Sequence, residues 1–356
     1  ERRAEPGFID LCTGTSAFDF TQFVDLDLPR ERLTDTLGYG SPAGQGELRE
    51  ALSRLYCQVL DVEVPPQRIV ITDGATSALH VAFLATLGVG DEVIVPSVGF
   101  PVFRSLAHMV GARCVIAPVD DRMLYDVTRL RELVTPRTRA IVVNTPSNPT
   151  MSALDPDELA QLLALGPWVI CDEVYSLVAH ADRPTSVLTQ SHSCFVVNSL
   201  SKSHGAPGLR VGYVIVPEGH IEIARTIRAN LSVCTSVPAQ LLARQLLAAN
   251  DQMLSSHRTY LRAQYASFRA LCGAAGIKIL GQPSAGFFCA VDASGRETQS
   301  TMDLALALLQ HEGIGVCPSA DFGEPDAGFL RLNYSVPLAR LESAVPRIAR
   351  YLGGSG

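Results

Sequence analysis

Lys202 lies in a stretch of hydroxyl-bearing, small and glycine residues from Asn198 to Gly205, and Arg210 follows eight positions after the lysine. No Asp or Glu stands within ten positions of Lys202, so an ion pair with a sequence neighbour is not indicated. A lysine that forms a Schiff base must lose its proton near neutral pH, which such surroundings favour. The hydroxyls and the guanidinium suit a phosphate. The stretch therefore suggests a lysine bound to pyridoxal phosphate; a glycine-rich loop with a solvated lysine is the alternative.

Other polar residues follow short apolar runs at the point where each run ends. These runs cover residues 68–72, 139–144, 168–172 and 194–198, and the residues in question are Ala75 and Thr76, Asn148, Asp172 and Tyr175, and Ser199 and Lys202. In open α/β sheets, ligands bind at the carboxyl ends of the strands. If these runs are parallel strands, the residues after them converge on one site.

The apolar runs also indicate the fold. They are continuously apolar and alternate with helical patterns, which predicts a mostly parallel, doubly wound α/β sheet buried on both faces. After residue 240 the pattern changes to strands near 286–291 and 329–334 and helices near 301–312 and 338–352. We therefore predict an N-terminal arm or small-domain segment (1–45), a large cofactor-binding domain (46–240) and a smaller α+β domain (241–356), linked by a long helix over about 239–274.

Composition narrows the function classes. The 356 residues are 47% hydrophobic and 18% charged, which predicts a large core, and the net charge of −7 argues against nucleic acid as a partner. Nine cysteines, an odd number without CxxC spacing, indicate reduced thiols in a cytoplasmic protein and no metal site. No apolar run is long enough for a membrane span, and the chain opens without an apolar signal segment.

Several further motifs appear in a fixed order. They are Tyr39 with Gly44 and Leu48-Arg49, Gly74-Ala75-Thr76, Pro96 with Phe100, Asn144-Thr-Pro-Ser-Asn148-Pro149-Thr150, Asp172-Glu173-Val174-Tyr175, Ser199-Leu-Ser-Lys202, Arg210 and Arg331-Leu-Asn. In this order and spacing the chain resembles the class I/II aminotransferase family, fold-type-I enzymes that use pyridoxal phosphate. The resemblance runs from about Ile9 to Leu352.

The resemblance implies roles around the pyridine ring of the cofactor. Lys202 is similar to the lysine that holds the cofactor as a Schiff base and carries the proton at the substrate Cα. Asp172 resembles the carboxylate that keeps the ring nitrogen protonated. Tyr175 and Asn148 resemble the residues that hydrogen bond to the phenolic oxygen. Phe100 resembles the aromatic residue stacked on the ring.

The resemblance also implies a phosphate site at the start of the helix after Gly74, where a helix N-terminus favours an anion. Its members are Gly74, Ala75, Thr76, Ser199, Ser201 and Arg210.

Substrate contacts and assembly follow from the same resemblance. Arg331 resembles the residue that binds the substrate α-carboxylate through a bidentate pair, with Asn148 beside it. Gly14 resembles an N-terminal glycine whose backbone closes over that carboxylate. Tyr39 resembles a tyrosine that reaches the phosphate of a neighbouring subunit, which implies a homodimer.

The chain departs from the family pattern near the substrate. Met151 stands where glycine is usual after Asn-Pro-Thr, Ser319 replaces a common glycine after Pro318, and Val98 and Gly99 alter the loop before Phe100.

The implied activity is transfer of an amino group between an α-amino acid and a 2-oxo acid. One alternative is elimination, replacement or cyclisation of a modified amino acid on the same scaffold, since fold alone does not determine the reaction. The other is an effector-sensing regulatory module with an aminotransferase-like domain.

Overall fold

A computed structural model describes residues 7–28, 37–181, 185–294, 300–323 and 326–353. Its main sheet has seven strands in the order β2-β8-β7-β6-β5-β3-β4. All neighbouring pairs are parallel except those that involve β8. The predicted mostly parallel sheet is therefore confirmed. The strands are β2 (Ile69–Thr72), β3 (Glu92–Pro96), β4 (Arg113–Ala117), β5 (Thr138–Asn144), β6 (Trp168–Asp172), β7 (Phe195–Ser199) and β8 (Gly212–Ile215).

Both faces of this sheet are covered by helices, which explains why its inner strands are largely apolar. Successive strand residues point to opposite faces, so Ile141 and Val143 pack on one side and Ala140 and Val142 on the other. The first side is covered by α2 (Gly46–Leu60), α5 (Val127–Leu133), α6 (Pro156–Leu163) and α9 (Val237–Ala248). The other is covered by α3 (Ala75–Thr86), α4 (Val102–Met109) and α8 (Ile221–Ser232).

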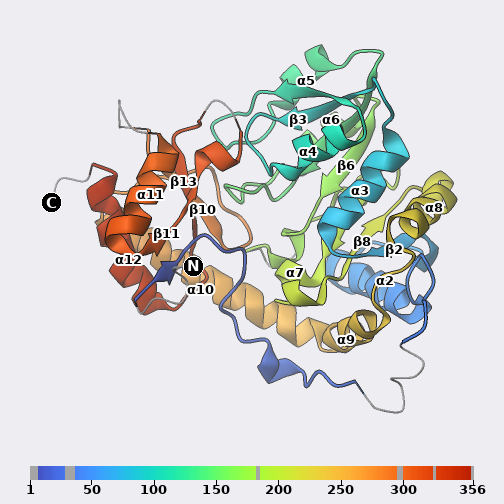
Figure 1. Ribbon diagram of the computed structural model, residues 1–356, viewed down its shortest axis with the longest axis horizontal. Helices are drawn as coiled ribbons and strands as arrows, with labels where there is room; N and C mark the ends of the chain where they lie inside the picture. The colour runs from blue at the N-terminus through green and yellow to red at the C-terminus, as the bar shows by residue number, and fades with distance from the viewer. Residues whose placement is uncertain (1–6, 29–36, 182–184, 295–299, 324–325, 354–356) are drawn as a thin grey trace.

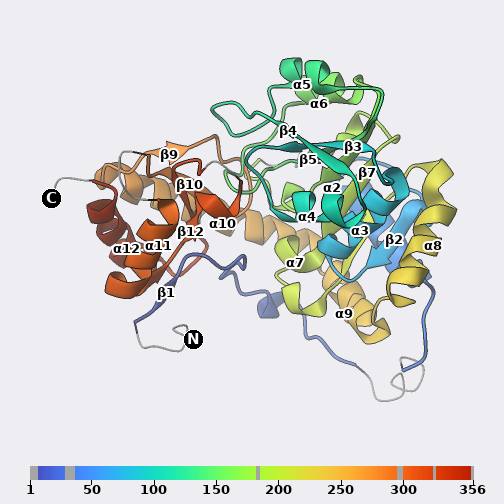
Figure 2. The same cartoon turned by 45° about the horizontal axis from the view of Figure 1, so that its top comes forward.

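A second sheet of four strands lies beside the first, at the left of Figure 1. Its order is β12 (Cys317–Pro318), β13 (Phe329–Asn333), β10 (Phe288–Asp292) and β9 (Ile279–Leu280), and all its pairs are antiparallel. Helices α11 (Thr301–Glu312) and α12 (Leu338–Tyr351) pack with it, and Figure 2 shows both helices on the side away from the seven-stranded sheet.

The N-terminal segment joins this smaller part. Strand β1 (Ile9–Asp10) pairs in parallel with β11 (Ile314–Gly315), and Ile9 and Leu11 are buried in the same core as β10 and β13. Residues 1–6 and 29–36 of the predicted arm lie outside the described residues.

The helical stretch predicted over 239–274 is two helices, α9 and α10 (Asn250–Ala274), with Ala249 between them. Asn250 is buried at this junction, where its Oδ1 bonds to His204 Nε2 at 3.1 Å. In Figure 1, α10 runs from α9 and α7 (Leu200–Ser203) to the smaller sheet. None of the described helices is long and apolar enough to cross a membrane.

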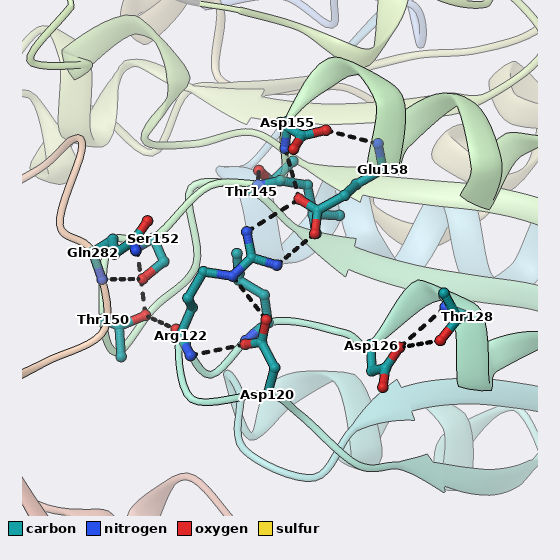
Figure 3. Close-up of polar contacts among 12 residues, drawn as sticks. Asp120, Arg122, Asp126, Thr128, Thr145, Thr150, Ser152, Asp155, Glu158 and Gln282 are labelled. Atoms are coloured by element: carbon teal, nitrogen blue, oxygen red, sulfur yellow. Dashed lines mark hydrogen bonds and ion pairs between the residues drawn. The ribbon is translucent and has the colours of Figure 1, made fainter.

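A polar cluster fixes the loop that follows β5 (Figure 3). Arg122 forms ion pairs with Asp120 and Glu158, and the backbone oxygen of Arg122 accepts a hydrogen bond from Thr150 at 3.2 Å. Glu158 also closes a capping box at the start of α6, where its backbone N–H donates to Asp155 Oδ1 at 2.8 Å. The cluster thereby holds the backbone on both sides of Met151, whose side chain is buried in the same hydrophobic cluster as Tyr175.

Replacing the helix cap should weaken this cluster. Asp155→Ala leaves the N–H of Glu158 without its side-chain acceptor, so we expect a loss of about 1 kcal/mol in the free energy of unfolding. Urea denaturation followed by circular dichroism measures this loss. The control is Asp157→Ala, which removes an exposed carboxylate from the same turn but no cap. Equal losses in the two variants would contradict the capping role.

Candidate functional site

The candidate site lies at one edge of the seven-stranded sheet. Strands β5, β6 and β7 run parallel, and β2 has the same direction as β7 because β8 is antiparallel to both. The carboxyl ends of all four strands therefore meet at one edge. The register places Asn144 directly beside Asp172, and Asn144 Nδ2 donates to the Asp172 backbone oxygen at 3.0 Å.

A cavity of about 310 Å³ opens at this edge. Most of the residues singled out from the sequence line it, together with several that were not. The lining consists of Gly14, Ala75, Thr76, Leu79, Phe100, Asn144, Asn148, Asp172, Val174, Tyr175, Ser199, Ser201, Lys202, Pro207, Arg210, Phe288 and Arg331. Gly74 lies immediately behind this lining, next to Arg210.

Tyr39 is the one candidate residue that the fold does not bring to the cavity of this chain. Its side chain is 88% exposed, and the N–H of the next residue, Gly40, donates to Cys234 Sγ at 3.2 Å.

Lys202 enters the cavity from α7, the short helix that follows β7. Ser199 caps this helix by accepting from the Ser201 N–H, and Lys202 Nζ donates to the Gly14 backbone oxygen at 2.7 Å. Burial, together with the positive charge of Arg331, lowers the pKa of Lys202 to about 8, so the neutral amine is accessible near neutral pH.

Asp172 is a buried carboxyl group with few partners. Its Oδ1 accepts one hydrogen bond from the Val174 N–H at 3.2 Å, and desolvation raises the pKa of Asp172 to about 7. A carboxyl group in this position would gain from a protonated nitrogen placed beside it. Burial also raises the pKa of Tyr175 above its ordinary value, so its hydroxyl stays a hydrogen-bond donor.

The part of the cavity lined by the start of α3 and by Arg210 suits a phosphate. Helix α3 begins at Ala75, so its first N–H groups face this end of the cavity, and Arg210 reaches over them with Nη2 3.3 Å from the Asp73 oxygen. Gly74 has φ +84°, and a Cβ there would lie 2.4 Å from Arg210 Nη2. A Cβ on Gly212 would lie 2.4 Å from the Gly74 carbonyl carbon. Gly74 therefore allows the Arg210 guanidinium to approach the backbone, and Gly212 allows the backbone of β8 to approach that of Gly74.

Arg331 reaches the cavity from β13, an inner strand of the smaller sheet. Its Nη1 donates to Asn148 Oδ1 at 3.0 Å and its Nη2 to the Cys12 oxygen at 2.8 Å, while its guanidinium carbon lies 3.9 Å from the centre of the Phe288 ring. Its Nε is buried and has no hydrogen-bond partner among the described residues. A carboxylate ligand would satisfy this group.

Five cavity residues were not singled out as site residues from the sequence: Leu79, Asn144, Val174, Pro207 and Phe288. Asn144 ends an apolar strand one step before the predicted loop, and its Oδ1 accepts from the Asn148 N–H at 2.8 Å. An amide side chain at the end of an apolar run was the signal in the sequence that could have identified Asn144 as a site residue. Phe288 lies within an apolar strand, where an aromatic residue carries no sequence signal of a site.

The site and the doubly wound sheet together define a fold-type-I enzyme that uses pyridoxal phosphate. A family model described as "Aminotransferase class I and II" matches residues 6–348, and the chain belongs to that family. Two relatives support this. A probable aspartate/prephenate aminotransferase of Aquifex aeolicus is 28% identical, with 97% of this chain and 91% of that protein covered. A valine–pyruvate aminotransferase of Mycobacterium tuberculosis is 30% identical, with 89% and 84% covered.

A solved structure agrees. Aspartate aminotransferase from Thermus thermophilus with maleate has a TM-score of 0.87 and 27% identity, and the match covers 98% of this chain and 93% of that one. The protein is therefore a pyridoxal-phosphate-dependent aminotransferase, as its sequence motifs predict.

Met151 lies in the same hydrophobic cluster as the cavity residue Tyr175 and has an unusual backbone conformation. It is fully buried with φ +58°, a region that favours glycine, the residue usual at this position. A Cβ on Gly286 would lie 2.5 Å from Met151 Sδ and 3.1 Å from Tyr175 Cδ1, so the thioether and the tyrosine ring pack over the same glycine.

At position 151 we therefore expect glycine to give a more stable protein than alanine, the reverse of the usual order. Met151→Ala loses the buried side chain, at about 2–5 kcal/mol, and keeps the left-handed backbone strain. Met151→Gly loses the same side chain but relieves about 1 kcal/mol of that strain. Chemical denaturation should find the glycine variant the more stable of the two, and a more stable alanine variant would contradict this reading.

The lowered pKa of Lys202 predicts a pH dependence in the cofactor-free protein. Between pH 8 and the ordinary lysine pKa of about 10.4, the unfolded chain binds more protons than the folded one, so stability rises with pH across this window. Lys202→Met should abolish this rise. The control is Lys278→Met, which removes the other, exposed lysine of the chain. Denaturation midpoints at pH 7 and 10 measure the rise in stability. The same rise in wild type and in Lys202→Met would show that Lys202 does not cause it.

Proposed function

We propose that Lys202 holds the cofactor and that Arg331 binds the α-carboxylate of the amino acid whose amino group is transferred to a 2-oxo acid. The observation that carries this proposal is the convergence of three groups on one cavity: the Lys202 amine, the buried Asp172 carboxyl and the Arg331 guanidinium. These groups come from two different sheets. The pKa of Lys202 is lowered and that of Asp172 is raised, while Nε of Arg331 has no hydrogen-bond partner among the described residues, and each of these properties suits the proposed role.

Several residues of the cavity are each proposed to contact a particular part of the cofactor. When bound, pyridoxal phosphate supplies an electron sink for the pair of electrons left at the substrate Cα. Asp172 would face the ring nitrogen, Tyr175 and Asn148 the phenolic oxygen, and Phe100 the ring. Ala75, Thr76, Ser199, Ser201 and Arg210, with Gly74 behind them, would hold the phosphate.

Proton transfer would fall to Lys202. Its Nζ can exist as the neutral amine near neutral pH, so it can accept a proton at the substrate Cα and deliver it elsewhere. Arg331, held by Asn148, would fix the substrate so that this proton faces Nζ. The Gly14 oxygen, which accepts from Nζ, places the N-terminal segment over the same point.

We also propose a homodimer in which Tyr39 reaches the phosphate site of the neighbouring subunit. The support is that Tyr39 is 88% exposed and lies outside the cavity of its own chain. The division into a segment 1–45, a large domain 46–240 and a small domain 241–356 fits the two sheets. The cytoplasm, a reducing compartment, suits nine free cysteines.

The reaction type is tested by its products. Purified enzyme is incubated with single amino acids, including aspartate and valine as suggested by the names of the relatives, with and without a 2-oxo acid acceptor. Transamination requires the acceptor for sustained turnover and forms one 2-oxo acid for each amino acid consumed. Acceptor-independent release of ammonia or of a side-chain fragment would establish elimination instead.

Removing the proposed cofactor lysine should abolish both colour and turnover. Lys202→Ala lacks the amine that holds the cofactor, so we expect loss of the visible absorbance band of the lysine-bound cofactor and at least a 10³-fold fall in kcat. Absorbance spectra and single-turnover assays measure these effects. Lys278→Ala is the matched control and should keep both properties. Retained colour in Lys202→Ala would show that another group holds the cofactor.

A further inference from the structure

Two cysteines meet beside Arg331. The parallel ladder between β1 and β11 pairs Asp10 with Gly315 and continues with the Leu11 N–H donating to the Gly315 oxygen at 2.8 Å. The next residue along, Cys12, reaches Cys317, and their thiols share a hydrogen bond. Cys12 is partly buried and packs against the small hydrophobic cluster that contains Cys317.

The pair belongs to the surroundings of the proposed substrate site. Cys317 is the cross-strand partner of Arg331 in the smaller sheet. The backbone oxygen of Cys12 accepts from Arg331 Nη2 at 2.8 Å, and two residues later the Gly14 oxygen accepts from Lys202 Nζ. A change at either sulfur therefore acts on backbone that contacts both cations.

The two thiols differ in reactivity. The hydrogen bond from Cys317 and the nearby charge of Arg331 lower the pKa of Cys12 to about 7, and Cys12 is partly exposed. The same hydrogen bond and burial raise the pKa of Cys317, whose thiol also lies 3.5 Å from Asp321 Oδ2. Because the thiolate is the reactive form, Cys12 is the nucleophile and Cys317 its neighbour.

Other cysteines that influence each other lack this asymmetry. Cys171 lies close enough to Cys194, and Cys272 to Cys289, for their charges to interact, but burial raises the pKa of all four thiols. All four are buried, so oxidants reach them poorly and find few thiolates.

We propose that Cys12 and Cys317 form a reversible disulfide site whose oxidation modifies the Arg331 pocket, with a peroxide as the oxidant. The Cys12 thiolate attacks one peroxide oxygen, the O–O bond breaks, and the departing hydroxide takes a proton to become water. The Cys317 sulfur then attacks the resulting sulfenic acid, forming the S–S bond. The S–O bond breaks, and the hydroxide leaves with the Cys317 proton as a second water.

The expected consequence is weaker substrate binding. Bond formation draws the two sulfurs to about 2.05 Å, which moves Cys12 towards β12 and displaces the oxygen that Arg331 uses as a partner. Oxidation should therefore raise KM for the amino acid several-fold more than it lowers kcat. This consequence rests on the proposed role of Arg331, whereas formation of the disulfide does not.

The first experiment maps the bond. The cofactor-loaded enzyme is treated with increasing hydrogen peroxide, alkylated, digested without reduction and analysed by mass spectrometry. We expect a peptide pair joined through Cys12 and Cys317, 2 Da lighter than the sum of the free peptides, to appear before any other disulfide and to vanish with dithiothreitol. Absence of this pair, or earlier formation of Cys171–Cys194 or Cys272–Cys289, would overturn the proposal.

Variants separate the thiol site from general oxidation. Cys317→Ser should lose the cross-link and accumulate sulfenic acid at Cys12, detectable with dimedone, whereas Cys57→Ser, which removes an exposed cysteine on α2, should oxidise like wild type. No dimedone adduct at Cys12 in Cys317→Ser would contradict its role as nucleophile.

Kinetics of the mapped, oxidised enzyme test the link to Arg331. A rise in KM that dithiothreitol reverses, and that Cys317→Ser does not show on peroxide treatment, supports it. An unchanged KM with the disulfide formed would overturn the link to the pocket. If no amino acid is turned over even by reduced enzyme while the disulfide still maps, the proposed function fails and the thiol site stands.

Discussion

The structure depends on the enclosure of one guanidinium. Arg331 belongs to the smaller sheet, yet its partners are a side chain from the loop after β5 and a backbone oxygen of the N-terminal segment. Three segments separated by more than a hundred residues therefore close around one charge. A buried cation requires such partners, because an unpaired one costs several kcal/mol. The contact that would orient a substrate is thus also a contact that ties the two sheets together.

The second constraint is dehydration of the sheet edge. The same burial moves Asp172 and Lys202 towards their neutral forms, since each charged form loses its hydration there. Asp172 ends β6 and Lys202 follows β7 closely, and the residues that begin both strands are apolar and contribute to the cores on both faces. Packing of the sheet and the protonation states of the site therefore have one cause.

Much of this arrangement could be read from the residues. Apolar strands without alternation indicated a sheet covered on both faces, and polar residues at strand ends indicated where the site would lie. The break at Ala249 was missed because alanine favours a helix and gives no sign of a helix end, whereas the structure shows the break in the Ala249 backbone, with φ −96° and ψ 12°. Phe288 was missed because its role depends on stacking with Arg331. The two residues are far apart in the sequence, and the pairing of β10 with β13 brings them together.

The location of Tyr39 could not be derived in the same way. The family resemblance suggested a contact with the phosphate of a neighbouring subunit, and within a single chain Tyr39 is exposed to solvent. Such a residue carries no local pattern, because the surface it would meet belongs to another molecule.

The reversed strand β8 has a mechanical consequence. Because it runs against β7, a single connection of twelve residues, 200–211, leaves the sheet edge and returns to it, and that connection carries both Lys202 and Arg210. Both ends of the connection are anchored in the same sheet, which fixes the spacing between these two cations. Arg331 belongs to the other sheet, so a displacement of one sheet relative to the other would change the distance from Arg331 to Lys202 and Arg210 but not the spacing between those two residues.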